Sequence, residues 1–397
     1  MSSMHGVENR GIYADLMRKF RNEGHQVVIV TPRERRSGEH TDLTEVDGVK
    51  ILGVHTLNLQ KTSIIEKGVG QVLVESQFKN AIKKHLAGQT FDLILYSTPP
   101  ITLIGAVRYL KKRNPQARTY LLLKDIFPQN AVDIGMMSKT GVKGLLYKHF
   151  RKQEKQLYKV SDYIGCMSPA NVEYVLKHNP EIERQRVEVA PNSYEIQEPI
   201  VLTQEQREAI RQKYNLPTDR PIFVYGGNLG RPQGIPFLIK CLDANSNRED
   251  CHFLVVGNGT EFGRMENWYK ENNPKNVSLY NRLPKEDYDQ LVRACDVGLI
   301  FLDYRFSIPN YPSRLLPYLM EKKPIIAATD PNCDTGSIAE QNGYGFWCPS
   351  NDVAAITGAV DKILQSDLRQ MGENGYKYFM DNYTIDHTYH TIIKHFK

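Results

Sequence analysis

The residues of this chain that could do chemistry gather behind one short apolar strand. Ile222 to Tyr225 predict the strand, and the loop at 226–234 reads GGNLGRPQG before an apolar segment with helical spacing begins. Backbone N–H groups without partners converge at such a helix start, and glycines let an anion approach them closely. Arg231 and Gln233 add donors, and a planar guanidinium can bind two phosphate oxygens at once. The loop therefore predicts a phosphate site, with an ordinary turn as the alternative.

Three later loops of the same half repeat this pattern of a strand followed by polar or glycine residues. The first is a glycine turn that leaves space for a flat ring or a ribose beside the backbone. The second ends a strand ahead of a helix, and the third places a serine at a helix start with an arginine behind it as a cation for a phosphate. Each loop alone is a weak signal, whereas four in one order are much stronger. The residues are Gly257, Asn258 and Gly259, then Arg282 and Leu283, then Ser313 and Arg314.

The composition is typical of a globular protein with more than one domain. The chain has 397 residues, of which 41% are hydrophobic and 24% are charged. Two domains are expected, because this length exceeds what one core comfortably supports. No apolar run approaches the roughly 20 residues of a membrane helix, and the N-terminus lacks the apolar core of a signal peptide, which predicts a cytoplasmic protein. The six cysteines form no CxxC pair, so neither a disulfide framework nor a zinc site is expected.

Basic residues concentrate in the first half of the chain, and the net charge is +6. In segment 144–160 they alternate with apolar residues at helical spacing. Attraction to an anionic membrane surface is one interpretation, worth about 1 kcal/mol per basic residue near the headgroups. Solvated helix faces are the commoner origin of any one cluster. Nucleic acid is not expected as a partner, because no motif for it accompanies the charge. The apolar residues that could form one face of this segment are Leu145, Leu146, Phe150, Leu157 and Tyr158.

Strands and helices alternate in two blocks, which predicts an α/β fold. The strands read as unalternated apolar runs between helices, as in a parallel sheet that is covered on both faces. We expect two doubly wound domains at 1–195 and 196–375, with a helical tail at 376–397. In open parallel sheets ligands bind beyond the carboxyl ends of the strands, where the loops above would lie. The tail is expected to consist of two helices with a break near 382–384.

The ordered loops carry a family resemblance. YGGNLGRPQG, VGNG, NRLPKEDYDQLVRACDVGLI and YPSRLLPYLMEKKPII resemble the nucleotide-sugar half of the family 4 retaining glycosyltransferases, whose GT-B fold has two Rossmann-like domains facing across a cleft. The first half is similar to the same family at GIYADLMRKFRNEGHQVVIVTP, LLLKDIFPQNAVDIGMM and CMSPANVEYV. The resemblance covers nearly the whole chain. It looks closest to the capsule and O-antigen branch, which includes N-acetylfucosamine transferases.

The resemblance implies roles for the loop residues. Fixed dipoles and an arginine would stabilise the charge that develops on the departing nucleoside diphosphate, which makes Arg231 a catalytic candidate and requires no metal. The DxD at Asp287 and Asp289 is read as the acidic start of a helix. No cofactor is expected, since the nucleotide-sugar is a substrate. The diphosphate would be held at Gly227, Asn228, Gly230, Arg231, Gln233, Ser313 and Arg314, and the base and ribose at Gly257, Asn258, Gly259, Arg282 and Leu283.

The chain departs from the family pattern at two places within its body. Family members usually carry two glutamates where this chain has Pro309 and Pro317, and Pro317 would distort any helix interior it occupied. Lys124 and Asp125 stand where many relatives have a histidine near the reacting sugar. Lys124 could offer a positive charge and Asp125 could accept a proton or hydrogen bond from an incoming hydroxyl. The alternative to these functional roles is that the two residues form a structural ion pair or a turn at the end of the strand.

A third departure concerns the beginning of the first domain. Relatives open with an apolar strand and a glycine-rich loop, whereas only MSSMHGVENR precedes the segment GIYADLMRKF. A doubly wound sheet without this first strand would leave unpaired backbone groups between its neighbours. We expect a strand and loop of roughly 10 to 20 residues to be missing, or another segment to repair the sheet. Asn9, Arg10 and Gly11 would then border the acceptor side.

The hypothesis from the sequence is a sugar transferase of surface polysaccharide synthesis. It would move a hexose from a UDP-sugar, with retained configuration, to a lipid-linked saccharide or polyprenyl diphosphate at the inner face of the cytoplasmic membrane. A nucleotide-sugar-binding subunit without catalysis is one alternative, and a UDP-sugar 2-epimerase, for which no acid/base carboxylate cluster is evident, is another. A nicotinamide dehydrogenase is disfavoured, because GGNLGRPQG lacks the GxGxxG spacing.

Overall fold

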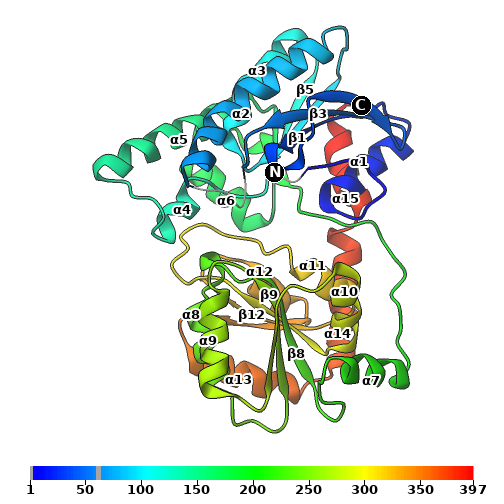
Figure 1. Cartoon of the computed structure of the whole chain (residues 1–397), viewed down its shortest axis with the longest axis vertical. Coiled ribbons are helices and arrows are strands. Elements are labelled where there is room, and N and C mark those ends of the chain that lie inside the picture. Colours follow the sequence, from blue (N-terminus) through cyan, green and yellow to red (C-terminus); the bar gives the residue numbers. More distant parts are fainter. Residues whose placement is uncertain (1–2, 60–63, 397) are drawn as a thin grey trace. The chain divides into compact units, whose positions relative to one another are not determined.

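A computed structural model describes residues 3–59 and 64–396 (Figure 1), apart from the side chains of 64, 65, 67–69, 71, 72, 142 and 143. The chain divides into two compact units. The first comprises Met1–Glu195 and Thr384–Lys397, and the second comprises Ile196–Tyr383. The sequence prediction placed the returning tail at 376–397, but the return begins only at Thr384, because the preceding helix packs within the second unit.

The first unit contains two separate sheets. One has the strand order β1-β3-β2 and the other β4-β5-β6-β7. In residues 3–59 and 64–396 no further strand joins the end strands β1 and β4. The strands are β1 (Val28–Glu34), β2 (Asp42–Val46), β3 (Val49–Thr56), β4 (Leu93–Thr98), β5 (Arg118–Leu123), β6 (Tyr163–Cys166) and β7 (Val187–Val189), and the helices are α1 (Ile12–Asn22), α2 (Ile64–His85), α3 (Ile104–Arg113), α4 (Gln129–Asp133), α5 (Gly141–Val160), α6 (Pro169–His178) and α15 (Ile385–Ile393).

The parallel strands of this unit were predicted, but β2 was not. It runs antiparallel to β3, with Val46 opposite Val49. The two residues between them, Asp47 and Gly48, have φ angles of 53° and 71°. An Asp-Gly pair with positive φ at both positions makes the two-residue hairpin turn that suits the twist of antiparallel strands. The prediction of purely parallel sheets therefore needs this correction at one edge.

Helices and the N-terminal segment cover both faces of these sheets. Phe78 and Ile82 of α2 pack on Leu52 and Val54 of β3. On another part of the unit α1 and α15 pack over β5, where Phe20 is buried. Strand β3 is buried along most of its length, which explains its unalternated apolar sequence.

Helix α5 does not present the single apolar face that its sequence predicted. Leu157 and Tyr158 are buried, with exposed fractions of 1% and 2%. Leu145 and Leu146 near the start of the helix are exposed, at 68% and 49%. Phe150 is half-buried and makes an edge contact with Phe127. The apolar residues of this helix thus divide between a core end and an exposed end.

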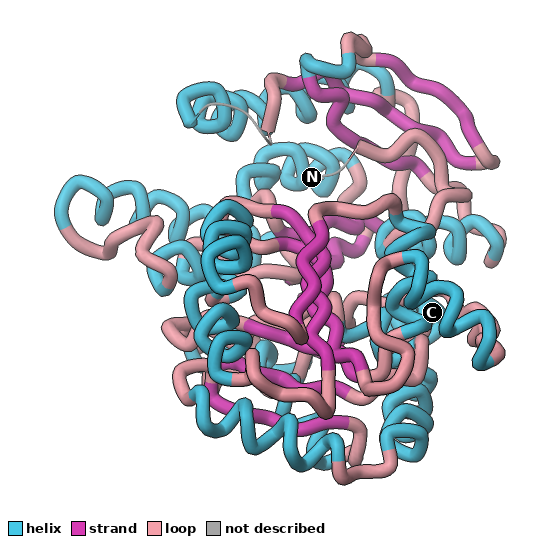
Figure 2. Tube along the Cα trace, turned by 60° about the horizontal axis from the view of Figure 1, so that its bottom comes forward, coloured by secondary structure: helices cyan, strands magenta, loops and turns pink. Residues whose placement is uncertain are grey.

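The second unit is built on one continuous parallel sheet of six strands in the order β10-β9-β8-β11-β12-β13, with helices on both sides (Figure 2). The strands are β8 (Ile222–Asn228), β9 (His252–Asn258), β10 (Val277–Tyr280), β11 (Val297–Phe301), β12 (Ile325–Thr329) and β13 (Gly345–Pro349), and the helices are α7 (Gln204–Lys213), α8 (Ile235–Ala244), α9 (Phe262–Asn272), α10 (Lys285–Ala294), α11 (Leu315–Met320), α12 (Thr335–Gln341), α13 (Val353–Leu364) and α14 (Leu368–Asn382).

The start of α7 and the break in the tail follow the prediction. Thr203 Oγ1 accepts a hydrogen bond from Gln206 N, and Gln206 Oε1 accepts one from Thr203 N, so the helix begins with a capping box. Helix α14 ends at Asn382 and α15 begins at Ile385. Ile385 N then donates to the carbonyl of Tyr194, which attaches the returning helix to the end of the first unit's main segment.

Candidate functional site

Four loops of the second unit follow adjacent strands at one edge of its sheet. Strands β10, β9, β8 and β11 are hydrogen-bonded neighbours in this order and run parallel, so their carboxyl ends share that edge. The loops behind them contain the donor-site residues that the sequence predicted. Their roles remain predictions, but the fold brings them to the place where parallel sheets bind ligands.

The ends of β8 and β9 approach each other so closely that only glycine fits. A Cβ at Gly257 would overlap the carbonyl oxygen of Gly227, and one at Gly259 would overlap the carbonyl of Leu229. Gly227 has φ 118°, which side-chain-bearing residues rarely adopt. Leu229 N donates to Asn258 O at 3.0 Å and locks the two loops together. The glycines therefore keep bare backbone at the strand ends.

The polar side chains behind β8 organise the loop itself. Gln233 Oε1 accepts hydrogen bonds from Asn228 Nδ2 at 2.9 Å and from Gly230 N at 3.2 Å. This leaves the Gln233 carboxamide turned inward onto its own loop. Arg231 has a 60% exposed side chain, and its Nε lies 3.9 Å from Glu261 Oε1. A contact of this length is weak, so the guanidinium is available to an anion.

Arg314 lies beneath the glycine segment of β8. Its guanidinium carbon is 4.4 Å from the centroid of the Tyr225 ring, a cation–π contact. Its Nη2 would lie 3.7 Å from a Cβ at Gly227, so the charge sits beside the bare backbone. Its Nη1 is buried and has no hydrogen-bond partner in the part of the chain described. A buried donor without a partner costs free energy, which a bound phosphate oxygen would recover.

Two tyrosines that the sequence analysis did not single out shape this position. Tyr318 Oη donates to Val224 O at 3.0 Å and accepts from Gly226 N at 3.2 Å. A Cβ at Gly226 would overlap Tyr288 Oη. Tyr288 belongs to α10 and is half-buried, whereas Tyr318 belongs to α11 and is fully buried, and both lie against β8. No sequence signal marked them, because their partners come from three separate elements.

Ser313 lies one residue before the N-cap position of α11. Helix α11 begins at Leu315 with Arg314 as its N-cap residue and without a side-chain cap bond. Pro317 is the third residue of this helix, in the first turn, where a backbone N–H has no intrahelical partner. The predicted distortion by Pro317 therefore does not arise, because the position tolerates a missing donor.

The predicted base and ribose residues belong to one connected turn. Asn258 Nδ2 donates to Asn281 Oδ1 at 2.7 Å, and the same oxygen accepts from Arg282 N at 2.6 Å. Arg282 is exposed and Leu283 is half-buried. Asn281, which the sequence analysis passed over, thus joins the loops behind β9 and β10.

Asp330, at the carboxyl end of β12, is a further residue that the sequence analysis missed. It is fully buried, and its Oδ1 accepts from Asn332 N at 2.9 Å and Cys333 N at 3.1 Å. Burial raises the pKa of its carboxyl to about 6. Asn332 Nδ2 and Cys333 Sγ bond the carbonyls of Phe306 and Asn310, so Asp330 fixes the loop that leads to Arg314. The sequence signal that could have identified Asp330 is an acidic residue directly after the apolar run of β12.

The DxD acids lie near the start of α10 and are engaged in ion pairs. Asp287 Oδ1 is 2.9 Å from Lys213 Nζ, and Asp289 pairs with Lys285 at 2.5 Å. Their location agrees with the reading as an acidic helix start. Within the residues that the structure describes, no group of three or more His, Cys, Asp or Glu side chains is arranged to hold a metal ion.

Lys124 and Asp125 follow β5 in the first unit and do not pair with each other. Lys124 Nζ donates to Ala190 O at 2.8 Å, and Asp125 Oδ1 accepts from Asn130 Nδ2 at 2.7 Å. Burial lowers the pKa of Lys124 to about 7 and raises that of Asp125 to about 6, the latter opposed by the bond from Asn130. Both groups can therefore exchange a proton near neutral pH.

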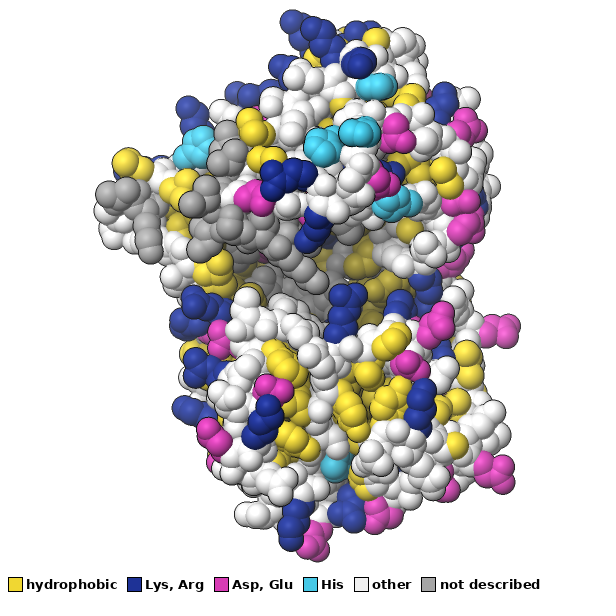
Figure 3. Space-filling view, in the orientation of Figure 1, with side chains coloured by type: hydrophobic (Ala, Val, Ile, Leu, Met, Phe, Trp, Pro, Cys, Tyr) yellow, Lys and Arg dark blue, Asp and Glu magenta, His cyan; other side chains and the backbone are white. Residues whose placement is uncertain are grey.

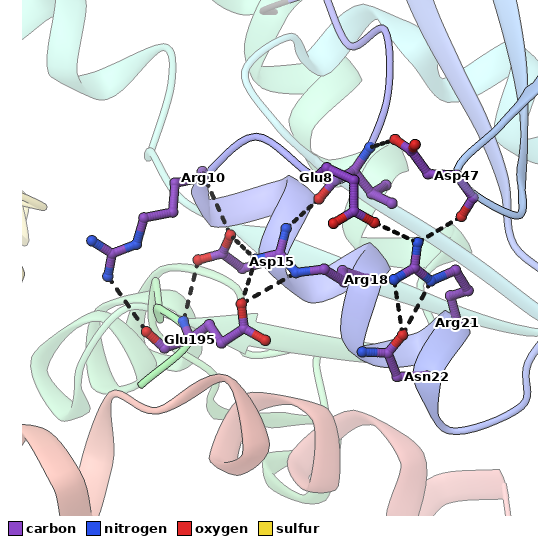
Figure 4. Close-up of polar contacts among 10 residues, drawn as sticks. Glu8, Arg10, Asp15, Arg18, Arg21, Asn22, Asp47 and Glu195 are labelled. Carbon is purple, nitrogen blue, oxygen red and sulfur yellow. Dashed lines mark hydrogen bonds and ion pairs between the residues drawn. The ribbon is translucent and has the colours of Figure 1, made fainter. Parts of the chain in front are cut away.

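The predicted acceptor-side residues border a buried ion-pair cluster (Figure 4). Gly11 N donates to Asp15 Oδ1 at 3.1 Å, and Arg10 Nη2 reaches Glu195 O at 3.5 Å. Arg18 joins Asp15 at 2.8 Å and Glu195 at 2.5 Å. The cluster fixes the segment before α1 against the end of the first unit's main segment. Asn9 is exposed.

Comparisons with known proteins agree with this arrangement. The family described as "Glycosyl transferases group 1" matches residues 206–378, nearly all of the second unit. The chain is a glycosyltransferase. The glycosyltransferase is 24% identical over 326 residues to "Probable glycosyltransferase WbjE" of Pseudomonas aeruginosa, covering 82% of this chain and 78% of the relative. It is 24% identical over 277 residues to WcaI of Escherichia coli K12, named for colanic acid biosynthesis, covering 69% and 66%.

Solved structures show that the glycosyltransferase has the GT-B fold. Sucrose-phosphate synthase from Thermosynechococcus elongatus superposes with a TM-score of 0.74 at 16% identity, covering 97% of this chain and 91% of that one. An Escherichia coli protein titled "Trehalose-6-phosphate" and bound with UDP-2-fluoro glucose gives a TM-score of 0.72 at 11% identity, covering 99% and 97%. The fold class predicted from the sequence is thereby confirmed.

Proposed function

We propose that this glycosyltransferase transfers a hexose from a UDP-sugar, with retained anomeric configuration, to a lipid-linked saccharide or polyprenyl diphosphate in surface polysaccharide synthesis. The observation that carries the donor half is Arg314, a half-buried cation with an unpartnered Nη1 beside the bare backbone of Gly227. A diphosphate is the ligand that this combination suits, because it offers several charged acceptors to a fixed guanidinium and to backbone N–H groups.

In the proposed reaction, the second unit stabilises the leaving group. The bond between the sugar and the diphosphate breaks and negative charge develops on the nucleoside diphosphate. Arg314 and the exposed Arg231 would meet that charge without reorganising, so they favour the transition state over the ground state. The reaction is proposed to need no metal, since these cations serve the role that a bound ion would otherwise fill.

Lys124 and Asp125 are proposed to act on the acceptor and the transferring sugar. Asp125, with a pKa of about 6, can accept a proton from an incoming hydroxyl at neutral pH, and Lys124 can present a positive charge when protonated. The names of WbjE and WcaI support a place in polysaccharide synthesis. The exposed Leu145 and Leu146 beside basic residues of α5 support contact with an anionic membrane surface at the inner face of the cytoplasmic membrane.

Two measurements test the donor half. Isothermal titration calorimetry should show UDP binding to the wild-type chain and a loss of roughly 10- to 100-fold in affinity for Arg314→Met, the range expected for a charged hydrogen bond of about 1.5–3 kcal/mol. Thermal unfolding of this variant should be unchanged or shifted upward, because a half-buried, incompletely paired cation is removed. Lys270→Met, which also removes one positive charge from the same unit at an exposed position of α9, is the control. Equal UDP affinity of Arg314→Met and wild type would refute the site.

Turnover separates this proposal from its alternatives. Radiolabelled UDP-sugars and a bacterial lipid extract should give a labelled lipid product. UDP binding without any product across the common donors would favour a binding subunit instead. Conversion of the donor sugar in the absence of any acceptor would favour an epimerase.

A further inference from the structure

A cavity of about 320 Å³ that is open to solvent lies within the first unit, between α2, α3 and α5. Arg108 of α3 and two residues of α5, His149 and Lys152, contribute to its walls, together with Glu75 of α2 and the carboxamide of Gln153. Three basic side chains and one acid therefore line one open cavity. The volume is at the small end of the range for ligand sites, which suits a headgroup better than an oligosaccharide.

The basic side chains of this cavity have no ion pair or hydrogen bond in the described part of the chain. Arg108, His149 and Lys152 are all exposed, and His149 contacts only the Phe150 ring beside it. Glu75, in contrast, is engaged: its Oε1 accepts a hydrogen bond from Gly105 N in the first turn of α3. The helix dipole and this bond offset its charge. The cavity is thus net positive, with cations that have no internal partner.

A buried amide in the cavity also lacks a partner. Gln153 Oε1 is inaccessible to solvent, with no hydrogen-bond partner in the residues that the structure describes. A carboxamide can present either its oxygen or its NH₂ at the same place by a half-turn of the side chain, so it can serve a phosphate hydroxyl or a phosphate oxygen. An unsatisfied buried oxygen costs free energy, and a rotation of the Gln153 side chain toward a phosphate in the cavity would recover that cost.

One stripe of α5 connects the cavity to the exposed apolar end of the helix. Leu145, His149 and Lys152 are spaced by four and three residues, so they lie on the same side of the helix. At a rise of about 1.5 Å per residue, Lys152 lies roughly 10 Å along the axis from Leu145, which is 68% exposed. Figure 3 shows further Lys and Arg side chains gathered on the first unit, over the part where Figure 1 draws α3. The exposed leucine and the basic residues thus lie within about 10 Å of one another along the helix, so a lipid chain and its phosphate could contact both.

We propose that this cavity binds the phosphate groups of a lipid-linked acceptor, with Leu145 and Leu146 against the lipid chain and Arg108, His149 and Lys152 on the phosphate oxygens. The inference rests on the proposed function, because it assumes that the acceptor carries a lipid diphosphate. It assigns the acceptor's headgroup to the first unit, whereas the donor loops belong to the second. Paired cations favour a diphosphate over the single phosphate of an ordinary bilayer lipid.

The test uses the full chain and geranyl diphosphate as the probe. Calorimetry should show binding to the wild type that weakens about tenfold in the double variant Arg108→Gln/Lys152→Gln, because two charge-assisted contacts to phosphate are lost. The control is Lys83→Gln/Lys84→Gln, which removes the same charge from exposed positions of α2 outside the cavity and should leave the affinity within twofold. Thermal unfolding checks that both variants are folded.

Two further arms identify the source of the phosphate. Inorganic diphosphate should bind more weakly than geranyl diphosphate, and equal affinities would overturn the lipid part of the inference. Vesicles of phosphatidylcholine and phosphatidylglycerol should lose binding to a similar extent with both double variants, since they sense overall charge. Selective loss of vesicle binding by Arg108→Gln/Lys152→Gln with unchanged geranyl diphosphate binding would assign the cavity to bilayer lipids and overturn the proposal.

UDP binding keeps this inference distinguishable from the proposed function. Both double variants should retain wild-type UDP affinity, because the donor loops lie in the second unit. A chain that transfers sugar equally well to an acceptor without phosphate, in wild type and Arg108→Gln/Lys152→Gln alike, would leave the proposed transfer intact and reject the cavity. A wild-type chain that binds geranyl diphosphate but never UDP would support the cavity and reject the proposed transfer.

Discussion

The loops behind β8 to β11 in the second unit and the loop behind β5 in the first unit carry different kinds of charge. In the second unit the predicted donor residues are arginines, carboxamides and bare backbone N–H groups, whose state does not change near neutral pH. In the first unit, Lys124 and Asp125 follow β5, with pKa values of about 7 and about 6. The difference fits two tasks: a diphosphate leaving group needs constant positive charge, whereas an acceptor hydroxyl must give up a proton. We therefore expect the pH dependence of proton transfer to arise in the first unit, whereas Asp330 of the second unit, whose pKa is also about 6, supports the loop that leads to Arg314.

The sheets that hold these loops also differ between the two units. The second unit holds its loops on one sheet of six strands, and close glycine contacts lock β8 to β9. The first unit has two sheets whose end strands β1 and β4 are not joined by another described strand. A rigid sheet edge suits the nucleoside diphosphate that we propose as its ligand.

Replacing Asp125 is the strongest way to break this comparison. Asp125→Asn keeps the oxygen that Asn130 bonds but cannot take up a proton, so kcat should fall by roughly 100- to 10,000-fold. Stability should change in the opposite direction. Burial raises the folded pKa to about 6, so the wild type is favoured when protonated, and this contribution is lost as pH rises through about 6.

The stability gain of Asp125→Asn over wild type should therefore be absent at pH 3.5, grow between about pH 4 and 6, and level off above. Its plateau is at most about 3 kcal/mol, from a shift of roughly two pKa units. Lys124 titrates in both proteins and cancels from the difference. Denaturant melts across this pH range measure it. A variant that gains stability but keeps its turnover would show that Asp125 is structural only.

Gly257→Ala tests the locked edge of the second unit. Its Cβ would overlap the carbonyl oxygen of Gly227, and because backbone cannot rotate away, we expect a loss of roughly 3 kcal/mol in the free energy of unfolding together with UDP binding. Gly263→Ala in α9 is the matched control, since nothing lies within 4 Å of its Cβ. There the helix should gain about 0.5–1 kcal/mol. Equal melting curves for the two variants would contradict the close approach of β8 and β9.

Most of this scaffold could be predicted from the sequence, because buried parallel strands appear in it as continuous apolar runs. The prediction missed β2, whose residues are all exposed, although the Asp47–Gly48 pair carried the hairpin signal. The predicted loops do meet at one sheet edge. The setting of Arg314 was beyond prediction, because Tyr288 and Tyr318 reach it from separate helices, and only tertiary packing decides which side chains surround a buried charge. The pKa values near Lys124 likewise depend on burial that no local pattern reveals.

Leu145→Ser/Leu146→Ser sharpens the contrast between the two ends of α5. Both side chains are exposed, so the free energy of unfolding should change by less than about 0.5 kcal/mol. Binding to anionic vesicles should weaken roughly 30-fold, since each of the two leucines loses on the order of 1 kcal/mol of transfer into the interface. Vesicle co-sedimentation measures this. Leu157→Ser, at the buried end, should instead destabilise the fold by about 3 kcal/mol. Unchanged vesicle binding by the exposed pair would remove this surface from the membrane proposal.

The smallest effect is expected at Pro317, one of the positions where the sequence departs from the pattern that it resembles. It lies in the first turn of α11, where the fixed φ of proline suits the helix and its missing N–H has no intrahelical role. Both units use this device, since α6 and α8 also carry proline in their first turns. Pro317→Ala should therefore change the free energy of unfolding by less than about 1 kcal/mol, mainly through the greater freedom of the unfolded chain. Chemical denaturation of the variant checks it. A loss of several kcal/mol would mean that the proline ring holds Tyr318 against β8, and the second unit's edge would then depend on that substitution rather than merely tolerate it.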